Sequence, residues 1–300
     1  MRSEPIREPL QQRAEAAGLA ARLPALQIEA RRIAAGILQG VHGRRRAGPG
    51  ETFWQFRPYQ AGDPAHRVDW RQSARGSRLF VREREWEAAQ AAWLWCDRSP
   101  SMTFRSSHAV PRKIERAAVL MIALGDLLVA GGERVGVLGH DERAVVGKTI
   151  PSRILRSLSG TEAIRAEEHL PPARIPGHAR TVLFGDFLEP VDTLRSWLEP
   201  RVAAGVKGVL LHVVDPAEET FPYTGRMLIE GMEQDGSRLV ENAGVLAARY
   251  RAVWQAHRDS LTEEARRRDW VHLVHRTDQP ASMALIALWQ ALALPTAGSA

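Results

Sequence analysis

The residues AAWLWC at 91–96 and DRSPS at 97–101 carry the strongest structural signal in this chain. The apolar run predicts a buried strand, and the polar residues after it place Asp97, Ser99 and Ser101 at the carboxyl end of that strand. Ligands of open α/β sheets bind outside the carboxyl ends of the strands, and hard cations such as Mg²⁺ prefer oxygen donors. The motif therefore predicts a cation site at the edge of an α/β sheet.

From residue 91 onward, strand-like apolar runs alternate with helical patterns. This alternation favours an α/β fold, with a mostly parallel sheet flanked by helices as in Rossmann-type proteins. The most continuous apolar runs suit strands that are buried on both faces. The expected strands are 91–96, 134–138, 144–147, 181–185, 208–214 and 270–275. The expected helices are 113–130, 151–158, 191–203, 245–268 and 281–292.

The first 90 residues are organised differently. Apolar residues at helical spacing predict an N-terminal helical segment over 1–39, which consists of one or two helices with a break expected at Pro24. Residues 40–90 contain two strand-like runs, 52–59 and 78–85, and few other apolar residues. We expect a small β-rich N-terminal module there, docked on an α/β domain that covers 91–300.

Composition points to an ordinary globular protein of the cytoplasm. Of the 300 residues, 44% are hydrophobic, and Cys96 is the single cysteine, which excludes an internal disulfide and a cysteine-rich zinc site. The two best apolar segments, 117–130 and 281–295, are too short to span a membrane, and residues 1–5 lack the apolar core of a secretory signal. We therefore expect a cytoplasmic protein with no membrane span.

The net charge of +6 is concentrated near the N-terminus. Residues 1–90 hold 16 arginines, no lysine and 10 acidic residues, whereas residues 91–300 are balanced. An arginine-rich patch is able to bind phosphate, nucleic acid or an acidic protein face. Arginine also outnumbers lysine throughout the chain, so we expect no nucleic acid as a partner, but binding through the arginines of 44–84 stays open as an alternative.

Two more oxygen-bearing residues complete the predicted site. Asp186 follows the strand 181–185 and should reach the same edge, and Thr161 lies in a loop after the helix 151–158. Together with Asp97, Ser99 and Ser101 they offer three hydroxyls and two carboxylates to one Mg²⁺, Mn²⁺ or Ca²⁺ ion. The nearby serines that compete for the role of Thr161 are Ser152, Ser157 and Ser159. An ion held mainly by hydroxyls stays under-neutralised, so it favours an acidic ligand from a partner protein.

At this point the chain resembles the von Willebrand factor A fold, whose metal-ion-dependent adhesion site (MIDAS) has the pattern Asp-x-Ser-x-Ser, a distant Thr and a later Asp. Upstream, GPGETF at 48–53, RPYQAGD at 57–63 and RVDWRQSAR at 67–75 resemble the motif block of the bacterial DUF58 family. The resemblance implies an adaptor without established catalytic activity, which works with MoxR-type AAA+ ATPases in assembling or activating other proteins. Many members carry an amino-terminal membrane hairpin, which we do not expect here.

The DUF58-like block has two interpretations. Its charges alternate in sign, a pattern suited to arginine–carboxylate pairs that hold a small module together, with Tyr59 and Trp70 as apolar anchors. Alternatively, exposed arginines dock an acidic partner. The residues concerned are Arg57, Tyr59, Asp63, Arg67, Asp69, Trp70 and Arg75.

The residues leave three functions open. The preferred one is a non-catalytic, metal-dependent protein-interaction module, and the others are a metal-dependent hydrolase or nuclease using Asp97 and Asp186 and a nucleic-acid binder. The hydrolase lacks a general base at persuasive spacing. Several enzyme classes are excluded because the chain contains no P-loop motif, no glycine-rich turn after 91–96 and no G-x-S-x-G.

Overall fold

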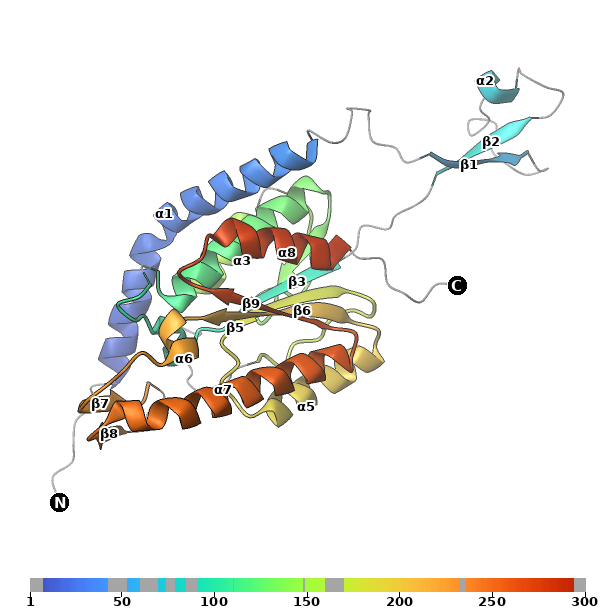
Figure 1. The fold of residues 1–300 in the computed structure, drawn as a ribbon. Coiled ribbons are helices and arrows are strands. Elements are labelled where there is room, and N and C mark those ends of the chain that lie inside the picture. Colours follow the sequence, from blue (N-terminus) through green and yellow to red (C-terminus); the bar gives the residue numbers. More distant parts are fainter. Residues whose placement is uncertain are drawn as a thin grey trace. The chain divides into compact units, whose positions relative to one another are not determined.

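The computed structural model describes residues 8–42, 53–59, 70–73, 79–84, 91–109, 111–147, 149–159, 170–232 and 236–293. The chain divides into two compact units (Figure 1). The larger consists of Met1–Gln39 together with Gln90–Ala300, and the smaller of Gly40–Ala89. The N-terminal helical segment, expected from the sequence as a region of its own, thus shares a unit with the α/β domain.

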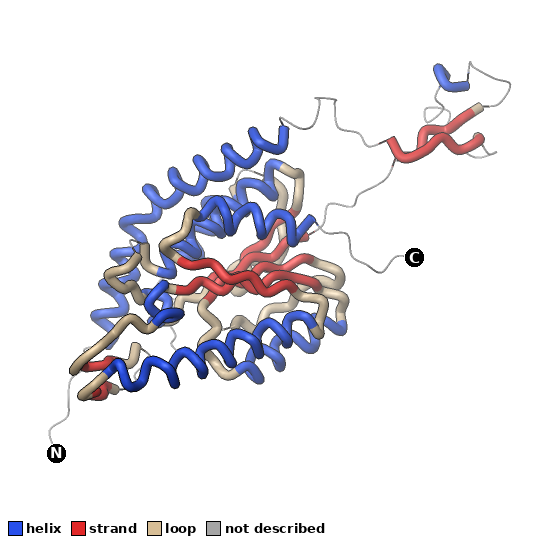
Figure 2. Tube along the Cα trace, viewed as in Figure 1, coloured by secondary structure: helices blue, strands red, loops and turns tan. Residues whose placement is uncertain are grey.

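A five-stranded parallel sheet forms the centre of the larger unit (Figure 2). Every neighbouring pair is parallel, which confirms the predicted α/β class with a mostly parallel sheet. Parallel strands end at one edge, so the residues that follow them gather there. In spatial order the strands are β4 (Arg134–Val137), β3 (Ala91–Cys96), β5 (Arg180–Gly185), β6 (Lys207–Val214) and β9 (Val271–Arg276).

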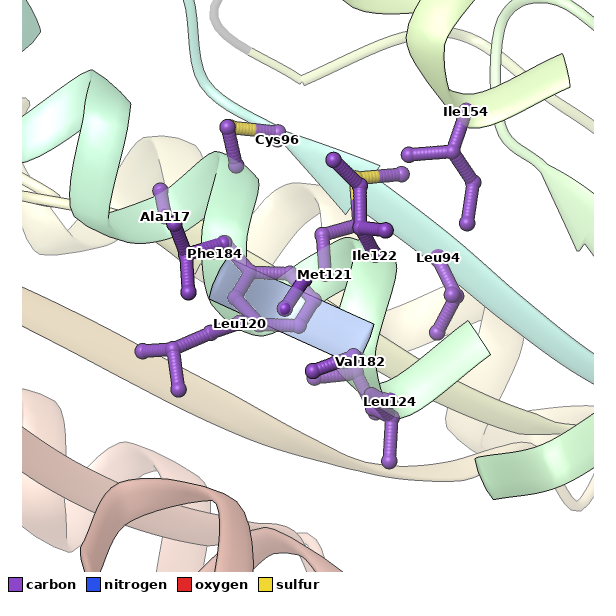
Figure 3. Packing of buried hydrophobic residues seen from close by; sticks show 14 of the residues in the cluster. Leu94, Cys96, Ala117, Leu120, Met121, Ile122, Leu124, Ile154, Val182 and Phe184 are labelled. Carbon is purple, nitrogen blue, oxygen red and sulfur yellow. The ribbon is translucent and has the colours of Figure 1, made fainter. Parts of the chain in front are cut away.

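One face of the sheet is covered by α3 (Lys113–Ala130), α4 (Ile150–Ser159) and α8 (Ala281–Ala293). Helix α3 is apolar almost all round, as expected for a helix buried between a sheet and other helices. Figure 3 shows Leu94 and Phe184 of the sheet packed against residues of this helix. Truncating such fully buried leucines typically costs about 2–5 kcal/mol, so each of them contributes substantially to the stability of the unit.

The opposite face is covered by α5 (Val191–Ala203) and α7 (Ala243–Arg266) (Figure 1). Successive residues of a strand point to opposite faces, so Trp93 packs into this second core while Leu94 packs into the first. Trp270, just before β9, belongs to the second core as well. The two covered faces explain why the strands read as continuous apolar runs.

Helix α1 (Glu8–His42) runs through Pro24, so the predicted break is wrong. An interior proline removes one helical hydrogen bond and costs about 3 kcal/mol in an exposed helix. Pro24 lies on the exposed side, where water is able to satisfy the freed carbonyl. The helix is held on both sides of the proline by a buried stripe, formed by Leu23, Leu26, Ala30 and Ala34.

The strand expected over 144–147 is also wrong. Among the described residues this segment forms only an isolated antiparallel bridge, in which Val145 and Val135 exchange two backbone hydrogen bonds of 2.8 and 3.0 Å. Gly147 follows with a φ of 121°, a conformation that L side chains rarely adopt and that ends the extended run. One bridged residue pair is too short to add a strand to the sheet edge.

Short elements follow β3 and β6. After β6 the chain forms the short helix α6 (Pro216–Thr220) and then an antiparallel hairpin of β7 (Met227–Glu230) and β8 (Ser237–Val240). A 3₁₀ turn, η2 (Pro100–Thr103), follows β3. Helix α6 and η2 both start at the carboxyl edge of the sheet.

The smaller unit contains β1 (Phe53–Pro58) paired antiparallel with β2 (Phe80–Arg84), and the short helix α2 (Trp70–Ser73). Both strands match the expected β content of this region. The backbone N–H of Phe80 donates to the Ser73 hydroxyl at 2.9 Å, which ties the helix to the hairpin.

Candidate functional site

Asp97 is held at the end of β3 by backbone and side-chain hydrogen bonds. Its N–H donates to the Phe184 carbonyl at 2.7 Å, which extends the β3–β5 ladder by one residue. Its carboxylate accepts from the N–H of Ser99 at 2.8 Å, an Asx-type turn of the kind that Asp favours. Gly185 leaves room for it, because a β-carbon there would lie 3.1 Å from the β-carbon of Asp97.

A chain of side-chain hydrogen bonds leads from this turn to the neighbouring strand. The hydroxyls of Ser99 and Ser101 lie 3.0 Å apart, and Ser101 Oγ donates to Asp186 Oδ2 at 2.7 Å. Asp97, Ser101 and Asp186 are all buried, at 3%, 6% and 2% exposure. The structure therefore brings together four of the five residues predicted for the site, at the carboxyl edge of β3 and β5.

Lys113, the first residue of α3, is part of the same cluster, and the sequence analysis missed it. Its side chain is fully buried, and its ammonium donates to Asp186 Oδ2 at 2.8 Å and to Glu218 Oε1 at 2.5 Å. Burial alone would lower the pKa of Lys113, but the attraction of Asp186 and Glu218 outweighs burial and raises this pKa. Lys113 is therefore a permanent positive charge between the two acids.

Helix α6 contributes the third side of the cluster. It begins with a capping box, in which Asp215 accepts from the N–H of Ala217 and Glu218 accepts from the N–H of Asp215, both at 2.8 Å. Asp215 also accepts from the N–H of Ser106 at 2.9 Å, which fixes the loop after η2. Because the cap orients Glu218, its carboxylate reaches Lys113.

The cluster has more acidic than basic groups. When ionised, the carboxylates of Asp97, Asp186 and Glu218 carry three negative charges, against one positive charge on Lys113. Burial, and next the adjacent Asp186 carboxylate, raise the pKa of Asp97 well above its ordinary value. Among the residues that the structure describes, Asp97 has no ion-pair partner. A further positive charge at this point would relieve the repulsion.

The donor set fits a hard divalent cation. It contains only oxygens, from Asp97, Ser99, Ser101 and Asp186, and the two hydroxyls lie side by side between the two carboxylates. Within the described ranges, no three His, Cys, Asp or Glu side chains are grouped as metal ligands. A cation at this edge would therefore depend on the serine hydroxyls.

Thr161 lies outside the described residues, so its predicted role stays a prediction. Two of the serines that compete with it are bonded within their own helix, α4: Ser157 Oγ donates to the Ile154 carbonyl and Ser159 Oγ to the Arg156 carbonyl. Ser152, at the start of that helix, is exposed.

The DUF58-like block is described only in part. Arg57 lies in β1 and Trp70 in α2, and Tyr59 is exposed at 37%, with its N–H bonded to the Leu79 carbonyl. The other predicted residues of this block lie outside the described ones: Asp63, Arg67, Asp69 and Arg75. The choice between a structural and a docking role for the block therefore stays open.

Lys113, Glu218 and Asp215 all have a signal in the sequence. The signal for Lys113 is its unusual position: it lies in the first turn of an apolar helical pattern, at the positive end of the helix dipole, where acidic residues are favoured over a lysine. Asp215 directly follows the apolar run of β6, as Asp97 and Asp186 follow theirs, and Asp-Pro-Ala-Glu at 215–218 is a capping-box pattern.

Across the described part of the chain, none of the helices combines the length and the apolar character that a membrane crossing needs.

Comparison with known proteins gives a family but no activity. A model of the family described as "Protein of unknown function DUF58" matches residues 55–260. Uncharacterized proteins of Mycobacterium tuberculosis (Rv1480) and Mycobacterium bovis (Mb1516) are each 27% identical over 266 residues, which cover 83% of this chain and 81% of theirs.

Solved structures of similar proteins include BatB from Bacteroides thetaiotaomicron, at 14% identity and a TM-score of 0.40 over 68% of this chain and 97% of BatB. An aerotolerance-related membrane protein from Bacteroides fragilis is 15% identical, with a TM-score of 0.36 over 68% of this chain and 98% of that protein. At these identities and TM-scores the similarity carries no conclusion about function.

Proposed function

We propose, on the premise that this chain belongs to the DUF58 family of proteins of unknown function, that it is a non-catalytic protein-interaction module that depends on a divalent cation. One observation carries the proposal. The turn that holds Asp97, Ser99 and Ser101 joins Asp186, which lies 85 residues beyond Ser101, in one hydrogen-bonded chain at the carboxyl edge of the sheet.

Each residue has a defined task in this proposal. Asp97 supplies a buried carboxylate whose repulsion with Asp186 a cation would relieve. Ser99 and Ser101 present their hydroxyl oxygens to the ion, and Asp186 orients Ser101 by accepting its proton. A bound Mg²⁺, Mn²⁺ or Ca²⁺ would supply Lewis acidity to an incoming oxygen ligand. The Asp-x-Ser-x-Ser turn and the later Asp186 support the resemblance to the MIDAS of the von Willebrand factor A fold, in which Thr161 would be the third hydroxyl ligand.

The contacts of Asp186 favour binding over catalysis. A hydrolase needs a carboxylate that is available to take a proton from water. Asp186 Oδ2 already accepts hydrogen bonds from Ser101 and from the buried ammonium of Lys113. Asp97 is committed to its own turn. The cluster is thus organised to hold an ion rather than to move protons.

We propose an acidic protein ligand as the partner. The two hydroxyls bring no charge to the ion and the Asp186 carboxylate is shared with the Lys113 ammonium, so a carboxylate from another protein is a favourable additional ligand. The DUF58 resemblance suggests that the partner system includes a MoxR-type AAA+ ATPase, which would provide the ATP-driven work that this chain has no P-loop to perform. We place this interaction in the cytoplasm, where ATP is available.

The test compares binding with and without the cation. Purified wild type is titrated with Mn²⁺ alone, and immobilised wild type is then tested for retention of a purified MoxR-type ATPase in Mg²⁺ and in EDTA. We expect Mn²⁺ binding and Mg²⁺-dependent retention, both lost in Ser99→Ala. Ser260→Ala, an exposed serine on α7, is the matched control. Equal retention in EDTA and by the Ser99 variant would contradict the proposal.

A further inference from the structure

Lys113 occupies a position that is unfavourable for a lysine in two ways. It stands in the first turn of α3, next to the positive end of the helix dipole, and its side chain has no solvent exposure. A buried ammonium is tolerated only when acidic groups compensate it closely. Asp186 at 2.8 Å and Glu218 at 2.5 Å provide this compensation.

The ammonium is adjacent to the oxygens proposed to bind the cation. Asp186 Oδ2 is shared, because it accepts from Lys113 and from Ser101. Ser101 in turn contacts Ser99. A divalent cation on the two hydroxyls would thus lie within two hydrogen-bonding steps of Lys113. Charges of like sign at such separations repel strongly inside a protein, where the effective dielectric constant is low.

Glu218 moderates this repulsion from the opposite side. Of the two acidic partners of Lys113, Asp186 is a proposed ligand of the cation and Glu218 is not. The capping box of α6 orients Glu218. Its negative charge offsets that of the ammonium. Removing the charge of Glu218 should make the site more positive, and removing the charge of Lys113 should make it more negative.

We propose that Lys113 is a positioning residue that weakens cation binding at the Asp97, Ser99, Ser101 and Asp186 cluster, and that Glu218 tunes this effect. The inference rests on the proposed function. Because the resident ammonium keeps the affinity for the cation alone low, filling of the site depends on the negative charge that an acidic partner brings. By linkage, cation and acidic ligand then each raise the affinity for the other.

The experiment measures the affinity for Mn²⁺ alone, by electron paramagnetic resonance of the free ion. Lys113→Met is expected to bind Mn²⁺ about tenfold or more tightly than wild type, because a unit charge close to the ion is removed. Glu218→Gln is expected to bind it more weakly. Opposite directions distinguish charge tuning from structural damage, which would weaken binding in both variants.

Two matched controls change the same charges elsewhere. Lys207→Met removes a lysine at the start of β6, on the opposite edge of the sheet, where it pairs with Asp269. Glu219→Gln removes the charge of the next residue in the chain. Glu219 pairs with Arg258 and Arg276 and not with Lys113. Both controls should bind Mn²⁺ as wild type does.

Each outcome decides a different claim. If Lys113→Met binds Mn²⁺ as tightly as wild type or more weakly, the proposed role of Lys113 is overturned. The proposed function still stands in that case, provided that Asp97→Ala loses Mn²⁺ binding. Binding by Lys113→Met but not by wild type supports the inference. Absence of Mn²⁺ binding in both overturns the inference and the proposed function together. If Lys113→Met fails to fold, Glu218→Gln decides, and wild-type affinity in that variant overturns the inference.

Discussion

Replacing Ser101 by alanine should destabilise the protein even without a cation. Ser101 Oγ donates to the buried, charged Asp186 at 2.7 Å and also contacts Ser99 Oγ at 3.0 Å. A hydrogen bond to a charged group contributes about 1.5–3 kcal/mol and one between neutral groups about 0.5–1.5 kcal/mol. Ser101→Ala loses both, so we expect a loss of about 2–4.5 kcal/mol. Ser99→Ala loses only the weaker bond and should cost about 1 kcal/mol.

The assay is urea unfolding in EDTA, with the midpoint compared at constant slope. Ser260→Ala, an exposed serine of α7, serves as control and should stay within about 0.5 kcal/mol of wild type. If Ser101→Ala proves as stable as this control, the Ser101–Asp186 hydrogen bond does not form and the description of the cluster is wrong.

Repeating the same measurement in Mg²⁺ tests the cation separately. An ion at about 100 times its dissociation constant stabilises the folded state by about 2.7 kcal/mol. Wild type and Ser260→Ala should gain this increment, and both Ser99→Ala and Ser101→Ala should lose most of it. If neither wild type nor Lys113→Met gains stability in Mg²⁺, cation binding is refuted, and the comparison in EDTA is unaffected.

Three further predictions concern the rest of the fold. Gly208→Ala should cost about 1–3 kcal/mol in urea unfolding, because its β-carbon would overlap the Thr181 carbonyl oxygen on the paired strand; a neutral result would contradict the packing. Burial lowers the pKa of His272 and of His275 to about 4, so the unfolded state binds more protons between about pH 4 and 6.5. Stability should therefore fall as the pH drops through this window, by about 1 kcal/mol for each histidine at about pH 5.5, and a flat pH profile would argue against their burial. Burial raises the pKa of the Cys96 thiol, so a thiol reagent should label it only on unfolding, and rapid labelling of the folded protein would contradict its position.

Much of the α/β unit could be predicted because its signals are local. Strand β3 and helices α3 and α5 have the predicted bounds, since their apolar periodicity and terminal residues are read directly from the chain. Asp97, Ser99 and Ser101 belong to one turn, so their mutual proximity follows from their spacing. Asp186 could be added because parallel strands end at a common edge.

Where packing between distant segments outweighs a local preference, the sequence misleads. Pro24 has a helix-breaking preference, yet α1 continues because a buried stripe on either side of it contacts the core. Residues 144–147 have strand-like composition, but after the bridge at Val145 the backbone at Gly147 leaves the extended conformation.

The sequence by itself determined the α/β class, the strand ends and the oxygen-bearing residues that meet there, because each depends on periodicity or on residues adjacent in the chain. Only the tertiary structure decided the charge of the site. The ammonium of Lys113 meets Asp186 and Glu218, which are 73 and 105 residues away, only because α3, β5 and α6 converge at the sheet edge. Electrostatic energy depends on distances in space, which the order of residues along the chain does not specify.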